Sequence, residues 1–304
     1  MIDPLKSKVH RQTALTEFLR LRRDGFQDWF ANLMTECHPD DFIRVRLSQG
    51  DGGLDGYRVS AKTVFQVFAP RHNTGKEMAN KMTGDFAKAV ATLAEQDLEM
   101  SEWIFVHNDP DDFPPEAIVA FAKLKEGNPT VSFKRWEFTA IWNEVEKLPE
   151  SKLDQLFGAA PTLKHLDNLQ YPQIIPVIER LVTEDAPPLP PIDLPDPGKL
   201  AYNQLPTDSA QLIQLGRNKT GVVEAYLSEI PDEDRPEDIA EAYRKKYRDL
   251  ADSGITVDEI FNVLWVFSGG EHFAGNPNGV AAVTAVMAYF FDRCDIFENA
   301  DQAQ

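Results

Sequence analysis

Residues 50–70, GDGGLDGYRVSAKTVFQVFAP, contain the residue types in this chain that are best suited to chemistry. Their glycines allow tight backbone geometry, and a tight turn can place Asp51 or Asp55 at the edge of a strand. A carboxylate there and a polar group on the adjacent strand can share Mg²⁺, which takes only one or two carboxylates and keeps most of its waters. A bound metal can generate hydroxide and stabilise charge on a phosphate, and a nearby lysine can neutralise the developing anion. A plain hairpin turn is the alternative, because Asp-Gly is a common turn dipeptide.

The strings GDGGLDGY and VFQVFA resemble the Mrr-type branch of the restriction-endonuclease-like superfamily. That family's pattern is a glycine-flanked acid, followed by a strand that ends in Gln or Glu, any residue, and Lys. The resemblance implies that Asp55 is the metal-binding acid, that Gln66 takes the second ligand position, and that the Val67 carbonyl completes a site for Mg²⁺ or Mn²⁺. The chain departs from the pattern at Phe68, which stands where the lysine is expected.

Members of this superfamily can carry the lysine on the following helix instead. Lys76 and Lys81 begin that helix here, in GKEMANKM. We expect one of them to point back at the strand ends and favour Lys81, while an ordinary exposed helix lysine is the alternative for each.

The neutral Gln66 leaves the site with less negative charge than a pair of acids. Asp41 or Asp51 is a candidate for the missing carboxylate. The alternative for Asp41 is that it caps a turn before the strand together with its neighbour Asp40.

The elements that must position these residues alternate between helix and strand over residues 1–160. Apolar residues recur at helical spacing over 12–36, with a break at Asp24-Gly25. This order predicts an α/β domain with a mixed central sheet and flanking helices, and it resembles the core of the same superfamily. The further segments are strands at 42–48, 55–60, 63–69, 102–108 and 130–136, and helices at 76–97, 114–126, 138–148 and 151–158.

The remainder of the chain consists of a linker region, 161–198, and an all-α domain, 199–304. Residues 186–198 contain six prolines, which favour an extended spacer. A helix is expected before this spacer within the linker region. The expected helices of the all-α domain are 208–228, 236–252, 256–268 and 277–293, and Thr256-Val-Asp-Glu259 fits a capping box at the start of the third.

The strings AYRKKYRDLADSGITVDEIF and AVMAYFFDRCDIFE, with the Gly-Gly between them, look like the C-terminal domain of ABC-three-component conflict systems of the Lamassu-like, anti-phage type. The resemblance covers about residues 199–298. It implies that this domain joins an effector to an SMC-like ABC ATPase and a small middle subunit. Together, the two resemblances imply a metal-dependent DNA endonuclease effector that its partners restrain until foreign DNA is sensed.

The net charge of −18 is unevenly distributed. Residues 1–100 hold 14 basic and 14 acidic residues, so the remaining residues carry the whole negative charge. The neutral residues 1–100 can present a basic face to DNA, for example through Arg20, Arg22, Arg23, Arg44, Arg46, Arg58 and Arg71. Their DNA affinity is expected to be weak, which favours a homo-oligomer on activation. The acidic remainder of the chain, residues 101–304, suits docking to a basic partner.

Two other functions are compatible with these patterns. In one, the domain of residues 1–160 keeps a nuclease fold, lacks catalytic activity, and binds DNA or protein as an adaptor for the ATPase. In the other, the chain is mainly a structural adaptor. No apolar run approaches the length of a membrane span, the start of the sequence lacks the apolar centre of a secretory signal, and there are only two cysteines, so we expect a cytoplasmic protein with reduced thiols.

Overall fold

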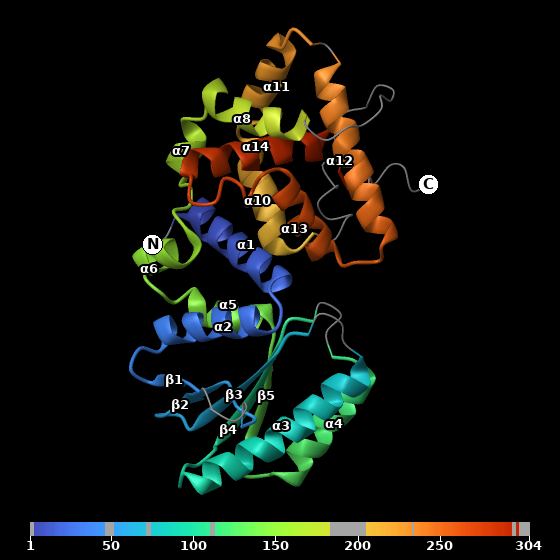
Figure 1. Cartoon of the computed structure of the whole chain (residues 1–304). Coiled ribbons are helices and arrows are strands. Elements are labelled where there is room, and N and C mark those ends of the chain that lie inside the picture. Colours follow the sequence, from blue (N-terminus) through green and yellow to red (C-terminus); the bar gives the residue numbers. More distant parts are fainter. Residues whose placement is uncertain are drawn as a thin grey trace. The chain divides into compact units, whose positions relative to one another are not determined.

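The computed structural model describes residues 3–45, 52–70, 74–109, 113–182, 205–232, 234–293 and 296–297 (Figure 1). The chain divides into two compact units, one of residues 17–152 and one of residues 1–16 together with 153–304. This division differs from the predicted boundaries after residues 160 and 198. The beginning of the chain and residues 153–182 belong with the helical unit, and the proline-rich segment 186–198 lies outside the described residues.

The α/β unit is built on a five-stranded sheet with the order β1-β2-β3-β4-β5. The first three strands are antiparallel and the last three are parallel, which confirms the predicted mixed sheet. Of the predicted strand 42–48, residues 42–44 form β1, Val45 follows the strand, and residues 46–48 lie outside the described residues. The strands are β1 Phe42–Arg44, β2 Gly56–Arg58, β3 Thr63–Phe68, β4 Glu102–His107 and β5 Ser132–Trp136.

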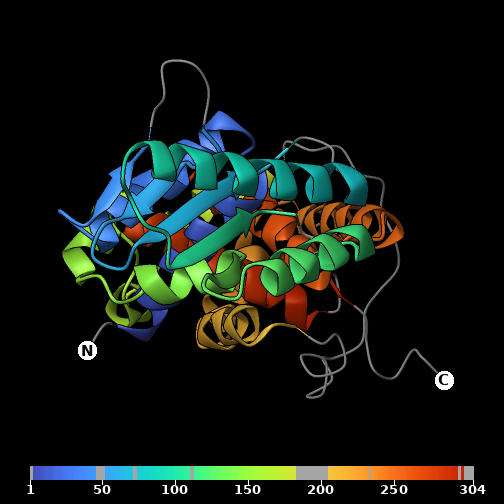
Figure 2. The same ribbon diagram turned by 90° about the horizontal axis from the view of Figure 1, so that it is seen from below.

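Helices cover both faces of this sheet. α2 (Asp24–Cys37) and α5 (Phe138–Val145) lie on one face, whereas α3 (Gly75–Glu95) and α4 (Pro115–Gly127) lie side by side on the other (Figures 1 and 2). Alternate residues of β3 therefore enter different cores: Phe65 contacts the ring of Phe30 on α2, and Val64 packs with α3 and α4. Burial on both sides explains why β3 and β4 are almost continuously apolar.

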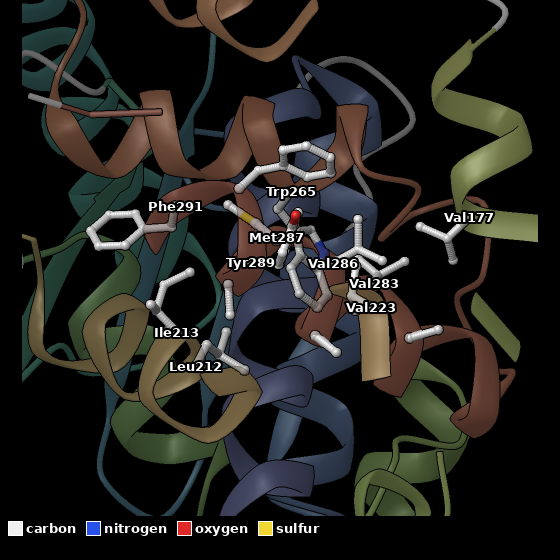
Figure 3. Close-up of a cluster of buried hydrophobic side chains, with 14 of the residues drawn as sticks. Val177, Leu212, Ile213, Val223, Trp265, Val283, Val286, Met287, Tyr289 and Phe291 are labelled. Carbon is white, nitrogen blue, oxygen red and sulfur yellow. The ribbon is translucent and has the colours of Figure 1, made fainter. Parts of the chain in front are cut away.

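The helical unit surrounds α14 (Pro277–Asp292), in which every residue from Gly279 to Phe291 is buried. Side chains from α8, α10, α11, α13 and α14 meet in this core (Figure 3). The predicted capping box is present at the start of α13. The other helices of the unit are α6 Glu150–Phe157, α7 Leu163–Asp167, α8 Tyr171–Val182, α10 Thr207–Arg217, α11 Thr220–Glu229, α12 Arg235–Asp252 and α13 Val257–Phe267.

α1 (Pro4–Arg20) contributes to both units. Its first part joins the helical unit because Leu5 and Val9 enter the helical core. Lys6 Nζ also lies 2.7 Å from the Asp154 carboxylate on α6, and Arg11 Nε lies 2.8 Å from Asp208 on α10. These contacts link positions far apart in the sequence, so no local pattern predicts them. Among the described helices, none has both the length and the apolar character needed to cross a membrane.

Asp41 lies at one end of the β1–β2 strand pair, and Asp55 lies at the other end. Its carboxylate accepts hydrogen bonds from the backbone N–H (2.7 Å) and hydroxyl (2.8 Å) of Ser60, and from Arg58 Nε (3.1 Å). Asp41 precedes the pair Phe42–Arg58, so β2 separates it from Asp55 by about 13 Å, at about 3.3 Å per residue. The structure therefore does not bring Asp41 to Asp55. The Asp41 carboxylate caps a turn, but this turn follows β2, whereas the predicted alternative is a turn before β1.

We expect the Asp41→Asn variant to be less stable than the native chain in a pH-dependent way. The hydrogen bonds from Ser60, and then Arg58, lower the pKa of the Asp41 carboxyl to about 2. Its stabilisation is therefore complete above the unfolded pKa of about 3.9 and is lost as the pH falls through the folded pKa. Because the carboxylate is partly exposed, we expect a loss of about 1 kcal/mol at pH 7 that shrinks toward pH 2.

Urea unfolding followed by tryptophan fluorescence measures this difference, since four of the five tryptophans lie in the α/β unit. Asp97→Asn, at an exposed position after α3, is the control. A difference between Asp41→Asn and the native chain that stays constant with pH would contradict the assignment.

Gly216→Ala should destabilise the helical unit. A Cβ at Gly216 on α10 would lie 2.4 Å from the Thr284 carbonyl oxygen and 2.8 Å from the Ala288 Cβ on α14. Overpacking of this kind lowers the free energy of unfolding by about 1–3 kcal/mol. The control is Gly221→Ala on α11, where a Cβ meets no atom within 4 Å and the change should be neutral or stabilising. Equal thermal unfolding of the two variants, measured by circular dichroism, would contradict this packing.

Candidate functional site

The glycine turn before β2 rests directly on α3. The Gly52 carbonyl accepts a hydrogen bond from the Thr92 hydroxyl at 3.0 Å. Gly53 has a φ of 78°, and a Cβ there would lie 2.1 Å from the Asp85 carbonyl oxygen and 2.7 Å from the Ala89 nitrogen. Only glycine fits this conformation and this close approach. The turn therefore fixes the position of Asp55 at the start of β2.

Asp55 is held against β3 by two hydrogen bonds. Its backbone N–H donates to the Phe65 carbonyl at 2.8 Å. Its carboxylate Oδ2 accepts a hydrogen bond from the Val67 N–H at 2.7 Å. The structure thus brings Asp55 to the Gln66–Val67 segment, as the two resembling strings implied.

Gln66 is completely buried in the middle of the sheet. Its Nε2 lies 3.5 Å from the Val67 carbonyl oxygen, and its Oε1 has no hydrogen-bond donor among the described residues. A buried acceptor without a donor costs about 1–3 kcal/mol. Such groups are rare in native proteins, so this one requires an explanation.

Gln27 on α2 is a neighbour of this segment that the sequence did not reveal. Its Nε2 also lies 3.5 Å from the Val67 carbonyl oxygen. Both amide contacts are at the long limit for a hydrogen bond. Gln27 carries no local signal, because its place depends on how α2 packs against β3.

The oxygen atoms of Asp55, Gln66 and Val67 fit a hard cation such as Mg²⁺, which takes few carboxylates and retains water. Gln66 Oε1 is the strongest evidence for a ligand, since it is an acceptor in need of a partner. The described residues contain no cluster of three or more His, Cys, Asp and Glu side chains suited to a metal. Asp55 supplies the carboxylate that we assign to this candidate site.

Phe68, at the position of the missing lysine, is partly buried and packs against the hydrophobic core. The Phe68 ring packs 5.9 Å from the ring of Phe105 on β4, centroid to centroid. Lys81 Nζ lies 2.7 Å from the carboxylate of Asp85, which is almost fully buried on the same helix, and Lys88 Nζ lies 3.5 Å from it. Lys76 is exposed in the first turn of α3. A catalytic role for Lys81 or Lys76 stays a prediction.

Two of the arginines predicted to contact DNA are already paired with carboxylates. Arg44 forms an ion pair with Asp28, and Arg58 Nε lies 3.1 Å from the Asp41 carboxylate. Their charges are therefore partly neutralised by neighbours. Asp51, Arg46 and Arg71 lie outside the described residues. Residues 17–152 hold 17 basic and 23 acidic residues, so the α/β unit as a whole is acidic rather than neutral.

The comparisons with known proteins address the helical unit. Residues 173–298 match a protein-family model, CTD10, which is the C-terminal domain 10 of the ABC-three component (ABC-3C) systems. The match begins within α8, earlier than residue 199, and extends beyond α14. No curated protein and no solved structure matches the chain, so the restriction-endonuclease-like fold of the α/β unit stays an expectation. The family match supports membership of the chain in an ABC-three component system.

Proposed function

We propose that the chain is the effector of an ABC-three component anti-phage system and that its α/β unit is a metal-dependent deoxyribonuclease. The observation that supports this proposal best is the buried Gln66 Oε1, an acceptor without a donor among the described residues. Gln66 precedes Val67, whose N–H binds the Asp55 carboxylate. A cation bound to Gln66 Oε1 would satisfy this acceptor. The match of residues 173–298 to a domain of ABC-three component systems supports the assignment of the chain to such a system.

Asp55, Gln66 Oε1 and the Val67 carbonyl would hold Mg²⁺ or Mn²⁺. When bound, that ion supplies a hydroxide nucleophile and stabilises negative charge on a phosphate. The Val67 N–H fixes the orientation of the Asp55 carboxylate, and the ring of Phe68, the residue after Val67, packs against Phe105. Lys81 or Lys76 would neutralise charge that develops on the phosphate.

The helical unit would dock the partner subunits, an SMC-like ABC ATPase and a small middle subunit. Residues 1–16 and 153–304 hold 14 basic and 26 acidic residues, which suits a basic partner surface. The α/β unit is also acidic, so DNA binding would be weak until the partners bring DNA or several copies of the chain together.

Two observations favour a second candidate function, in which the α/β unit is a non-catalytic module that binds DNA or protein. Phe68 fills the place of the lysine, and Lys81 is already paired with the buried Asp85. The metal site and the cleavage activity are therefore tested separately.

Gln66→Met should stabilise the chain and weaken metal binding. Methionine has a similar shape and removes the unsatisfied acceptor, so we expect a gain of about 1–2 kcal/mol in the free energy of unfolding. Titration with Mn²⁺ followed by electron paramagnetic resonance should show weaker binding than in the native chain. The matched control is Gln12→Met, because the buried Gln12 donates to Asn262 at 2.9 Å and its loss should destabilise. Unchanged Mn²⁺ affinity in Gln66→Met would remove Gln66 from the site.

Asp55→Asn should abolish DNA cleavage without unfolding the chain. The asparagine oxygen can still accept the hydrogen bond from Val67 N–H, whereas the negative charge that a cation requires is lost. We expect cleavage of plasmid DNA in Mg²⁺ or Mn²⁺ to fall at least about 100-fold, as when a group essential to the transition state is removed.

The cleavage assay uses the full chain alone and with its ATPase and middle subunits, with Asp97→Asn as the control of equal charge change. Cleavage that persists in Asp55→Asn contradicts the site assignment. If the native chain fails to cut in every combination, the non-catalytic function is favoured instead.

A further inference from the structure

The turn between α1 and α2 lies at the carboxyl end of β3, next to the candidate site. The Arg23 N–H donates to the carbonyl of Ala69, just beyond β3, at 2.6 Å. One turn later, Gln27 Nε2 lies 3.5 Å from the Val67 carbonyl oxygen. In α/β sheets, ligands bind outside the carboxyl ends of the parallel strands. Arg23 is therefore at the edge of the sheet where a substrate of Asp55 and Gln66 would lie.

The backbone of Arg23 is strained. Its φ is 51° and its ψ is −130°, a region that residues with a side chain rarely adopt and that glycine enters freely. Strain of this kind persists only where the surroundings impose it, and it concentrates at functional sites.

The neighbours of Arg23 impose this conformation. Asn108, just after β4, donates from Nδ2 to the carbonyls of Phe18 (2.9 Å) and Leu21 (2.7 Å). The Arg22 guanidinium donates to the Leu19 carbonyl at 2.5 Å and to the Leu21 carbonyl at 2.8 Å. The end of α1 is thus tied to the sheet, and the turn has little freedom to relax.

The Arg23 side chain is exposed, and no ion pair joins it to a carboxylate of the described residues. This distinguishes it from Arg44 and Arg58. Arg23 is also the N-cap of α2, with no side-chain hydrogen bond to the first turn. A cation is unfavourable at the positive end of a helix, and the acidic Asp24 in the first turn offsets this only in part. An anion bound at Arg23 would compensate for this placement.

We propose that Arg23 binds the phosphate backbone of a nucleic-acid substrate beside Asp55, Gln66 and Val67. The identity of the bound strand as a substrate rests on the proposed nuclease function, whereas the binding of phosphate by Arg23 does not require cleavage. Arginine suits this role because its guanidinium presents a planar pair of donors to phosphate oxygens.

The test is the Arg23→Gly variant of the full chain. Glycine removes the guanidinium and relieves the backbone strain, so a loss of binding cannot be attributed to unfolding. The control is Lys62→Gly, because Lys62 is also exposed, has a φ of 50° and precedes the opposite end of β3, but is paired with Glu99. Both variants lose one positive charge. Binding to a fluorescein-labelled 20-base-pair duplex is measured by anisotropy in EDTA at low salt, where metal-dependent cleavage does not occur.

We expect Arg23→Gly to melt at the same or a higher temperature than the native chain and to bind the duplex about tenfold more weakly, with a salt slope smaller by about one. Lys62→Gly should bind like the native chain. Three outcomes would each overturn the proposal. Arg23→Gly binds as well as the native chain, both variants lose the same affinity, or the native chain does not bind. These outcomes are independent of plasmid cleavage, so a native chain that binds through Arg23 and does not cut contradicts only the nuclease function.

Discussion

The hydrogen bond between the Asp55 carboxylate and the Val67 N–H, 2.7 Å long, is the interaction on which the candidate site depends. It requires the register of β2 on β3, in which Gly56 pairs with Phe65. A slip of one residue would turn Gln66 to the other face of the sheet and remove the carboxylate from Val67. It also requires Gly53, because a larger residue would push the turn away from α3. The hydrogen bond between Asp55 and Val67 therefore depends on both Gly53 and the strand register.

Three unfavourable features occur at this edge of the sheet. Gln66 buries an acceptor without a donor, Arg23 has a strained backbone, and Arg23 also brings a positive charge to the start of α2. The same unit also has positive φ at Asp40, Lys62 and Asp97, and a buried Trp103 Nε1 with no acceptor among the described residues, whereas β3 is apolar on both faces and α3 begins with a capping box. Proteins depart from such local consistency mainly at functional sites. An anionic substrate and a cation would together relieve the unfavourable charge and the unsatisfied acceptor.

Much of the fold could be predicted because its signals are local. The apolar runs of β3 and β4 and the Thr256–Glu259 capping box lie within a few residues of what they determine. The break predicted at Asp24-Gly25 falls slightly earlier, at residues 21–23, because Asp24 begins α2. Asp55, Gln66 and Val67 were named from the family resemblance, and the structure brings them together because β2 and β3 form one hairpin. Their metal-binding role stays a prediction. The place of the first part of α1 and of α8 in the helical unit could not be predicted, because it depends on packing between distant segments. The pairing of Arg44 with Asp28 and the approach of Gln27 to Val67 likewise follow from how α2 lies on the sheet.

The most direct test of the metal site is X-ray diffraction from crystals of the full chain soaked in Mn²⁺, with the anomalous signal of manganese recorded. Occupation of the site predicts an anomalous peak about 2.1 Å from an Asp55 carboxylate oxygen and from Gln66 Oε1, close to the Val67 carbonyl. Peaks confined to other carboxylates, with none beside Asp55 and Gln66, would contradict the assignment. The unsatisfied acceptor of Gln66 would then be a cost without a ligand, and the non-catalytic function would be the better account of the α/β unit.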